Sequence, residues 1–303
     1  MFLIGIDGGG TSTRVELRDE QNQLLSRKFY GALNLNSIGE AAFYDRLKDI
    51  FSLPMQDCFS ICIGTAGVSN QDVERILREI LAEVRYEGPW KLCGDQEIAL
   101  RGAMDGPGIA VIAGTGSICF GKNEKGETAR SGGYGHLIDD WGSGYALGRD
   151  ALSAAVKTID GRENNQALCS SVFQKLRVTT AQELISFVYS GETKKSDVAA
   201  LAAVVLELAE KEDQASEVIL RKEAEEVVCM VKAVQKNLSL EGCSIALLGG
   251  LFASDNPYRK IVSSLLGSMG KVQLPRHDAL WGAAQMAWEL RKNNTAETPC
   301  GEI

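Results

Sequence analysis

The same local pattern occurs twice in this chain of 303 residues: an apolar run, a turn of glycine and hydroxyl residues, and a second run. The first copy covers residues 2–18 and contains FLIGIDGGGTST; the second covers residues 108–122 and contains GIAVIAGTGSICFG. Short apolar runs that end in glycines are typical of buried strands. Because a repeated supersecondary unit indicates a repeated fold, the two copies predict an internal duplication, with one domain opening on each copy.

Strands and helices alternate after each copy, which predicts an α/β protein with mixed sheets. We expect an N-terminal domain at residues 1–107 and a C-terminal domain at residues 108–292. The last helix, residues 278–291, should pack back on the first domain, and the polar tail 293–303 should be frayed. A stretch with little glycine or proline, from about residue 196 to 239, predicts a long helical region.

The overall charge and cysteine pattern narrow the class of protein. A net charge of −8 argues against a general nucleic-acid or membrane-surface binder, whose footprint would be basic. No apolar stretch approaches the ~20 residues that span a bilayer, and no signal-peptide pattern opens the chain. The eight cysteines include no CxxC pair, so neither a zinc ribbon nor a disulfide scaffold is predicted. We therefore expect a cytoplasmic protein.

The glycine turns suit phosphate, because glycine permits positive φ and lets backbone N–H groups approach an anion. A P-loop is excluded: the spacing from Gly116 to Lys122 fits, but Asn123 replaces the hydroxyl residue and a hairpin follows instead of a helix. A dinucleotide motif is excluded as well, since residues 142–148 have one residue too many and follow no clear strand. Hairpins between antiparallel strands remain. We expect the two hairpins to face each other across an interdomain cleft.

The two hairpins supply the expected donors to the nucleotide phosphates. Asp7, just ahead of the first hairpin, is placed to hold Mg²⁺, directly or through water. The expected phosphate-binding residues are Gly9, Gly10, Thr11, Ser12 and Thr13 in the first hairpin and Thr115, Gly116 and Ser117 in the second.

Several motifs resemble a known superfamily. DGGGTST, GTGS and LLGG occur in the order of the two phosphate motifs and the adenosine motif of the actin/hexokinase/Hsp70 superfamily. Residues 131–152, SGGYGHLIDDWGSGYALGRDAL, are similar to the signature of the BadF/BadG/BcrA/BcrD ATPase family, which contains N-acetylglucosamine kinase. The resemblance extends to about residue 290. It implies two ribonuclease H-like (actin-like ATPase) domains, use of ATP and Mg²⁺, and a homodimer.

For a sugar kinase, the candidate general base is Asp95, which lies where a short strand ends and a helix begins. The resemblance matches Asp95 to the catalytic aspartate of the family; a plain helix N-cap is the alternative. Asn34 and Asn36 in GALNLN can donate to and accept from vicinal sugar hydroxyls, the alternative being an Asx turn.

The resemblance adds four further positions. It implies that Gly133 and Asp140 contact the sugar, although the neighbouring Asp139 leaves open which carboxylate does so. It also implies that Gly249 and Gly250 flank the adenine and ribose of ATP.

These residues predict phosphorylation of an amino sugar at its 6-hydroxyl, most readily N-acetylglucosamine. The sequence does not separate this sugar from N-acetylmuramic acid, glucosamine or glucose.

Two other functions compete with this prediction. ATPase activators of 2-hydroxyacyl-CoA dehydratases and benzoyl-CoA reductases bridge an iron–sulfur cluster between two subunits, which needs four thiolates. Here Cys169 is one candidate ligand, but Trp141 stands where its partner is expected, so a dimer would supply only two. A nucleotide-dependent transcription regulator would carry an added N-terminal helix-turn-helix, whereas this sequence opens directly on the first hairpin.

Overall fold

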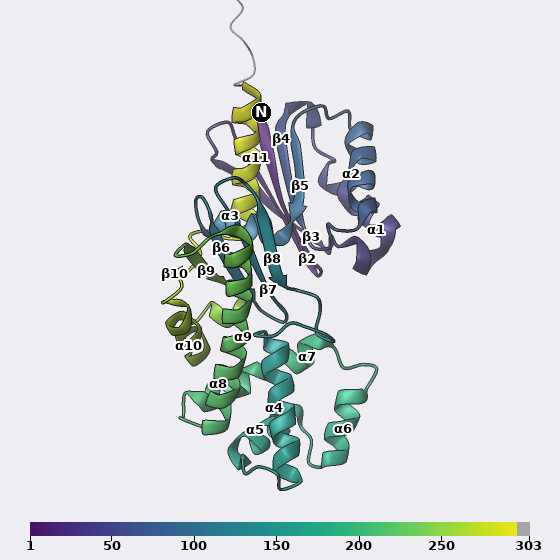
Figure 1. Ribbon diagram of the computed structural model, residues 1–303. Helices are drawn as coiled ribbons and strands as arrows, with labels where there is room; N and C mark the ends of the chain where they lie inside the picture. The colour runs from purple at the N-terminus through teal and green to yellow at the C-terminus, as the bar shows by residue number, and fades with distance from the viewer. Residues whose placement is uncertain (296–303) are drawn as a thin grey trace, which may run out of the picture. The chain divides into compact units, whose positions relative to one another are not determined.

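The computed structural model describes residues 1–295. The chain divides into two compact units (Figure 1). Unit 1 combines Met1–Gly106 with the chain from Pro275 onward, and unit 2 is Pro107–Leu274. The last helix, α11 (Ala279–Thr295), therefore belongs to unit 1. The predicted frayed tail begins inside this helix, and residues 296–303 lie outside the described residues.

Unit 1 is built on a five-stranded mixed sheet with the strand order β3-β2-β1-β4-β5. The first three strands form antiparallel pairs, and β1, β4 and β5 run parallel. The strands are β1 (Phe2–Gly8), β2 (Ser12–Arg18), β3 (Leu24–Gly31), β4 (Cys58–Thr65) and β5 (Trp90–Gly94).

Helices cover both faces of this sheet, because successive side chains of a strand point to opposite faces. Ile4 belongs to a core cluster with side chains of α1 (Leu35–Ile50) and α2 (Gln71–Glu83), and η1 (Met55–Asp57) adds Met55 to it. The next residue back, Leu3, belongs to a cluster with α3 (Asp95–Ala103) and α11. A Cβ on Gly5 would lie 2.5 Å from the backbone N of Ala284, so α11 packs directly on β1, as Figure 1 shows.

Unit 2 repeats this sheet. Its strand order is β10-β9-β6-β7-β8, with β6, β7 and β8 antiparallel and β6, β9 and β10 parallel. The two sheets share one topology, so the predicted duplication and the α/β class are confirmed. The strands are β6 (Gly108–Ala113), β7 (Ser117–Lys122), β8 (Thr128–Gly132), β9 (Ser244–Leu248) and β10 (Lys271–Gln273).

The helical region predicted from about residue 196 to 239 is confirmed, and it is interrupted by short breaks. Three helices occupy it, and Asp213 begins the last of them by accepting a hydrogen bond from Ser216 N at 2.9 Å. The preceding Glu212 has a left-handed backbone with φ 61°, which ends the earlier helix. The helical elements of unit 2 are α4 (Gly144–Ile159), α5 (Gln166–Leu176), α6 (Ala181–Tyr189), α7 (Lys195–Ala199), α8 (Ala202–Ala209), α9 (Gln214–Leu238), η2 (Gly250–Phe252) and α10 (Pro257–Leu266).

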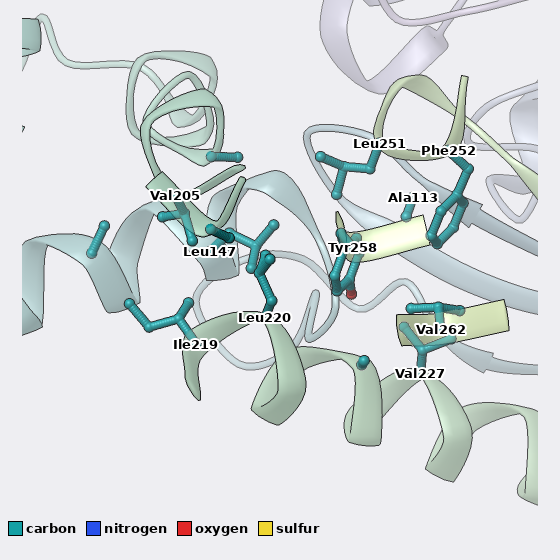
Figure 2. Packing of buried hydrophobic residues seen from close by; sticks show 14 of the residues in the cluster. Ala113, Leu147, Val205, Ile219, Leu220, Val227, Leu251, Phe252, Tyr258 and Val262 are labelled. Atoms are coloured by element: carbon teal, nitrogen blue, oxygen red, sulfur yellow. The ribbon is translucent and has the colours of Figure 1, made fainter. Parts of the chain in front are cut away.

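The core of unit 2 gathers around Tyr258 of α10, which is fully buried (Figure 2). Figure 2 shows the Tyr258 ring among side chains that include Leu251 of η2 and Val227 of α9. The Tyr258 hydroxyl donates a hydrogen bond to the carbonyl oxygen of Gly142 at 2.8 Å, so this core side chain reaches the segment ahead of α4. Among residues 1–295, no helix is long and apolar enough to cross a membrane.

Candidate active site

The carboxyl ends of three parallel strands in unit 1 bring two candidate residues to one edge of the sheet. Asp7 near the end of β1 pairs in register with Gly64 of β4, and Gly64 pairs with Cys93 of β5. Asp95 begins α3 immediately after β5. Open α/β sheets place functional groups at this edge, and here it carries two acidic side chains.

The β1–β2 hairpin is closed by a hydrogen bond from Gly9 N to Ser12 O at 3.0 Å. Gly10 and Thr11, at the tip of the hairpin, are exposed. Thr13 is buried, and its hydroxyl donates to Gly31 O at 2.8 Å, which ties β2 to β3. The tip therefore offers exposed backbone and hydroxyl groups, whereas Gly9 and Thr13 make bonds within the fold.

Asp7 has a cationic partner that the sequence analysis missed. Arg14 lies opposite Asp7 in the β1–β2 register, and its Nη2 is 2.6 Å from Asp7 Oδ2. The same guanidinium reaches Asp278 Oδ2 at 2.8 Å. Because the two residues face each other across a predicted hairpin, the register was the signal that could have revealed the pair.

The side chain of Asp95 is exposed to water, and its pKa is raised. Its Oδ1 accepts a hydrogen bond from Gln96 N at 3.0 Å at the start of α3. Partial loss of solvation raises the pKa of Asp95, and the charge of Asp7 raises it further, while the Gln96 bond lowers it. A carboxylate that binds a proton more readily than usual, and that water can reach, is suited to general-base chemistry.

The predicted asparagines lie in a polar cluster at the start of α1. Asn34 is the N-cap of this helix, and its Oδ1 accepts from Asn36 N at 3.1 Å, so the Asx-turn bond named as the alternative for Asn34 is present. Asn36 is exposed and accepts a hydrogen bond from Asn70 Nδ2 at 2.8 Å. A Cβ on Gly67, whose φ is +80°, would lie 2.9 Å from Asn34 Oδ1. The glycine thus leaves room for the amide side chains.

In unit 2, the β6–β7 hairpin is closed by Gly114 N donating to Gly116 O at 2.9 Å, with Thr115 exposed at its tip. Ser117 is buried, and its hydroxyl donates to Trp141 O at 2.6 Å. Gly249 and Gly250 are exposed just after β9. They lie beside the hairpin because β9 pairs with β6, and a Cβ on Gly249 would be 2.2 Å from Ala113 O.

Asp140 is almost completely enclosed, with 3% of its surface exposed. Its Oδ1 accepts from Ser117 N at 3.3 Å, and its Oδ2 is 2.5 Å from Lys195 Nζ of α7. Asp139 instead accepts from Tyr134 N at 3.0 Å, next to Gly133, which is exposed with φ +77°. The structure thus joins Asp140 to the hairpin.

Lys195 was not predicted, because it lies outside every motif. A Cβ on Gly116 would come within 2.7 Å of Lys195 Nζ, so the ammonium group sits directly against the hairpin glycine.

The sequence of residues 4–287 matches the model of the BadF/BadG/BcrA/BcrD ATPase family. The chain belongs to this family. An N-acetylmuramic acid/N-acetylglucosamine kinase of Clostridium acetobutylicum is 33% identical over 300 residues, covering 94% of this chain and 98% of the relative. An N-acetyl-D-glucosamine kinase of Dictyostelium discoideum is 31% identical over 258 residues, which cover 79% of this chain and 81% of the relative.

Solved structures support the fold of this BadF/BadG/BcrA/BcrD family member. A candidate N-acetylglucosamine kinase of Chromobacterium violaceum has a TM-score of 0.75 at 26% identity, covering 94% of this chain and 98% of that one. A ROK hexokinase of Thermus thermophilus has a TM-score of 0.61 at 17% identity, and the match covers 97% of this chain and 100% of that one. At this identity the match shows a similar fold. The predicted class of two actin-like ATPase domains is confirmed.

Proposed function

We propose that this protein is a kinase that transfers the γ-phosphoryl group of ATP to the 6-hydroxyl of an amino sugar, with N-acetylglucosamine as the first candidate. The observation that carries the proposal is the sheet edge of unit 1, where the glycine hairpin and Asp7 stand beside Asp95. Family membership supports ATP use, and the amino-sugar kinases matched over most of the chain support the acceptor.

In the proposed reaction, Asp95 accepts the proton of the 6-hydroxyl as that oxygen attacks the γ-phosphorus. A bond forms between O6 and phosphorus, the bond from phosphorus to the bridging oxygen breaks, and ADP leaves. The tips of both glycine hairpins donate backbone and hydroxyl hydrogens to phosphate oxygens, and Gly249 and Gly250 leave space for the nucleoside. Asn34, Asn36, Gly133 and Asp140 are proposed to orient the sugar.

Magnesium fits the donor set of unit 1. The Asp7 side chain is 16% exposed and offers the hard oxygen ligand that Mg²⁺ prefers. Within residues 1–295 no group of three or more His, Cys, Asp or Glu side chains could hold a metal. Asp7 would therefore hold Mg²⁺ together with water and ATP oxygens, as is usual for this ion. When bound, Mg²⁺ neutralises charge on the phosphates.

The activator function predicted as the alternative has less support from the site. Cys169, its one candidate cluster ligand, is buried, and burial raises the pKa of its thiol. A raised pKa disfavours the thiolate that an iron–sulfur cluster needs.

The experiment is an ADP-release assay with Mg²⁺ and a panel of sugars, run beside the visible spectrum of the purified protein. N-acetylglucosamine should stimulate ADP release, and its 6-deoxy analogue, which lacks the acceptor oxygen, should not. ADP release that is independent of sugar, from a brown protein, would contradict the kinase and favour the activator. We also propose a cytoplasmic location, from the cysteine pattern of the sequence, and a homodimer, from the family resemblance. Light scattering during gel filtration tests the assembly.

A further inference from the structure

Glu223 of α9 is an acidic side chain with no exposed surface and no part in the reaction proposed above. Its Oε2 accepts a hydrogen bond from the backbone N–H of Gly142 at 2.6 Å. Its Oε1 has no hydrogen-bond partner within the described residues. Within residues 1–295 only two long ion pairs of 3.6 Å compensate Oε1, and a buried carboxylate so weakly paired is unfavourable for folding, which points to a role other than stability.

The Gly142 peptide is held from both sides. Glu223 accepts a hydrogen bond from the N–H of Gly142, and the buried hydroxyl of Tyr258 donates one to the carbonyl oxygen of Gly142 at 2.8 Å. Gly142 has φ +79°, and a Cβ there would lie 2.5 Å from Val227 Cγ2. The backbone of Gly142 therefore packs too closely against Val227 of α9 to carry a larger side chain, and the two hydrogen bonds hold its peptide groups.

This peptide lies between two of the groups that the proposed reaction uses in unit 2, Asp140 and the β6–β7 hairpin. Two residues earlier, Asp140 bonds to Ser117 N, and two residues later, Gly144 N donates to Gly114 O at 2.8 Å. A shift of Gly142 would thus move the Asp140 carboxylate relative to the β6–β7 hairpin.

We propose that Glu223 is a positioning residue, which through Gly142 holds Asp140 in the place where it binds the sugar. This inference rests on the proposed function and goes beyond it, because it assigns control of sugar affinity to a residue that has no part in the proposed reaction. It also makes that affinity depend on the charge of Glu223. An ionised carboxylate accepts a stronger hydrogen bond from Gly142 than a protonated one does.

The surroundings of Glu223 place its titration near neutrality. Burial raises the pKa of Glu223 to about 7, while the hydrogen bond from Gly142 lowers it, Asp150 raises it, and Lys222 and Arg149 lower it. Arg149 Nη2 of α4 and Lys222 Nζ of α9 each lie 3.6 Å from Oε1. From α10 the facing group is the Tyr258 hydroxyl, which stays protonated because burial raises its pKa. Lowering the pH through about 7 should therefore weaken sugar binding.

The test measures the KM for the sugar at saturating ATP from pH 6 to pH 8 in the full-length protein and in Glu223→Gln. In the unmodified protein the sugar KM should rise roughly fivefold as pH falls across this range. The reason is that the hydrogen bond from Gly142 to Glu223 is weaker when the carboxyl group is neutral than when it is charged. Glu223→Gln should show the raised KM at every pH. The matched control is Glu225→Gln, an exposed acid on the same helix, which should follow the unmodified profile.

A Glu223→Gln profile that parallels the unmodified one would overturn the inference, even if the variant is less stable. Should this variant not fold, Tyr258→Phe removes the other hold on Gly142 while keeping the ring. It should raise the sugar KM severalfold at every pH, and an unchanged KM would count against the inference. Failure of the kinase itself would be seen separately, as no sugar-dependent ADP release by the unmodified protein.

Discussion

Asp95 shows how one residue can be tested for its role without disturbing the fold. In Asp95→Asn the amide oxygen can still accept the hydrogen bond of Gln96 N, but the side chain cannot take up the proton of the sugar hydroxyl. We expect kcat to fall by about 10² or more while the KM for ATP stays within a factor of ~2. Steady-state kinetics with N-acetylglucosamine checks this, and a kcat reduced less than about threefold would exclude Asp95 as the base.

At the scale of single residues, the sequence was informative where a side chain acts within its own motif. The positions of Asp95 and Asn34 at junctions of strand, loop and helix could be predicted because turns and caps are local. Lys195 and Glu223 could not, since their partners lie 55 and 81 residues away along the chain. Nothing in a single sequence marks which lysine or glutamate a folded segment will meet. The roles of the predicted site residues remain predictions.

Glu223 of α9 is buried, and the contribution of its carboxyl group to the free energy of unfolding should therefore depend on pH. In the folded protein the pKa of Glu223 is raised from an ordinary 4.5 to about 7, so the stability that this group contributes is present below pH 4.5 and is lost as pH rises through about 7. The free energy of unfolding of the unmodified protein, relative to Glu223→Gln, should therefore fall by about 3 kcal/mol between pH 4.5 and pH 8. Urea unfolding at four pH values measures it, with Glu225→Gln as the control. A difference that does not change with pH would contradict the raised pKa.

The elements themselves were predictable to different degrees. The strands and hairpins of both units could be placed because glycines end the apolar runs. The breaks between α7, α8 and α9 could not, because neither glycine nor proline marks them. The chain instead turns at Glu212, a non-glycine residue with φ 61°, and Asp213 caps the next helix. A capping aspartate within a helix-forming stretch is a weak signal until the tertiary contacts are known.

For the molecule as a whole, the duplication was the most informative property of the sequence. Two similar strand pairs, in residues 2–18 and 108–122, were enough to predict two related domains, and the two sheets share one strand order. A repeated topology means that equivalent hairpins exist in both units. The repeat does not predict the side chains around each hairpin, which differ between the copies: Asp7 pairs with Arg14 in one, and Asp140 pairs with Lys195 in the other.

Ligand binding tests the proposed magnesium role at the scale of the whole chain, because a ligand that binds only the folded state raises the free energy of unfolding. MgATP at a hundred times its Kd should add about 2.7 kcal/mol, seen as a rise in Tm, and EDTA should remove most of that rise. Asp7→Asn should lose the magnesium-dependent part of the shift. Asp278→Asn is the matched control: it also removes a carboxylate partner of Arg14, and asparagine can replace aspartate in its bond to Trp281 N at the start of α11. If both variants lost the shift equally, the effect would belong to Arg14, and Asp7 would have no separate role in holding the metal.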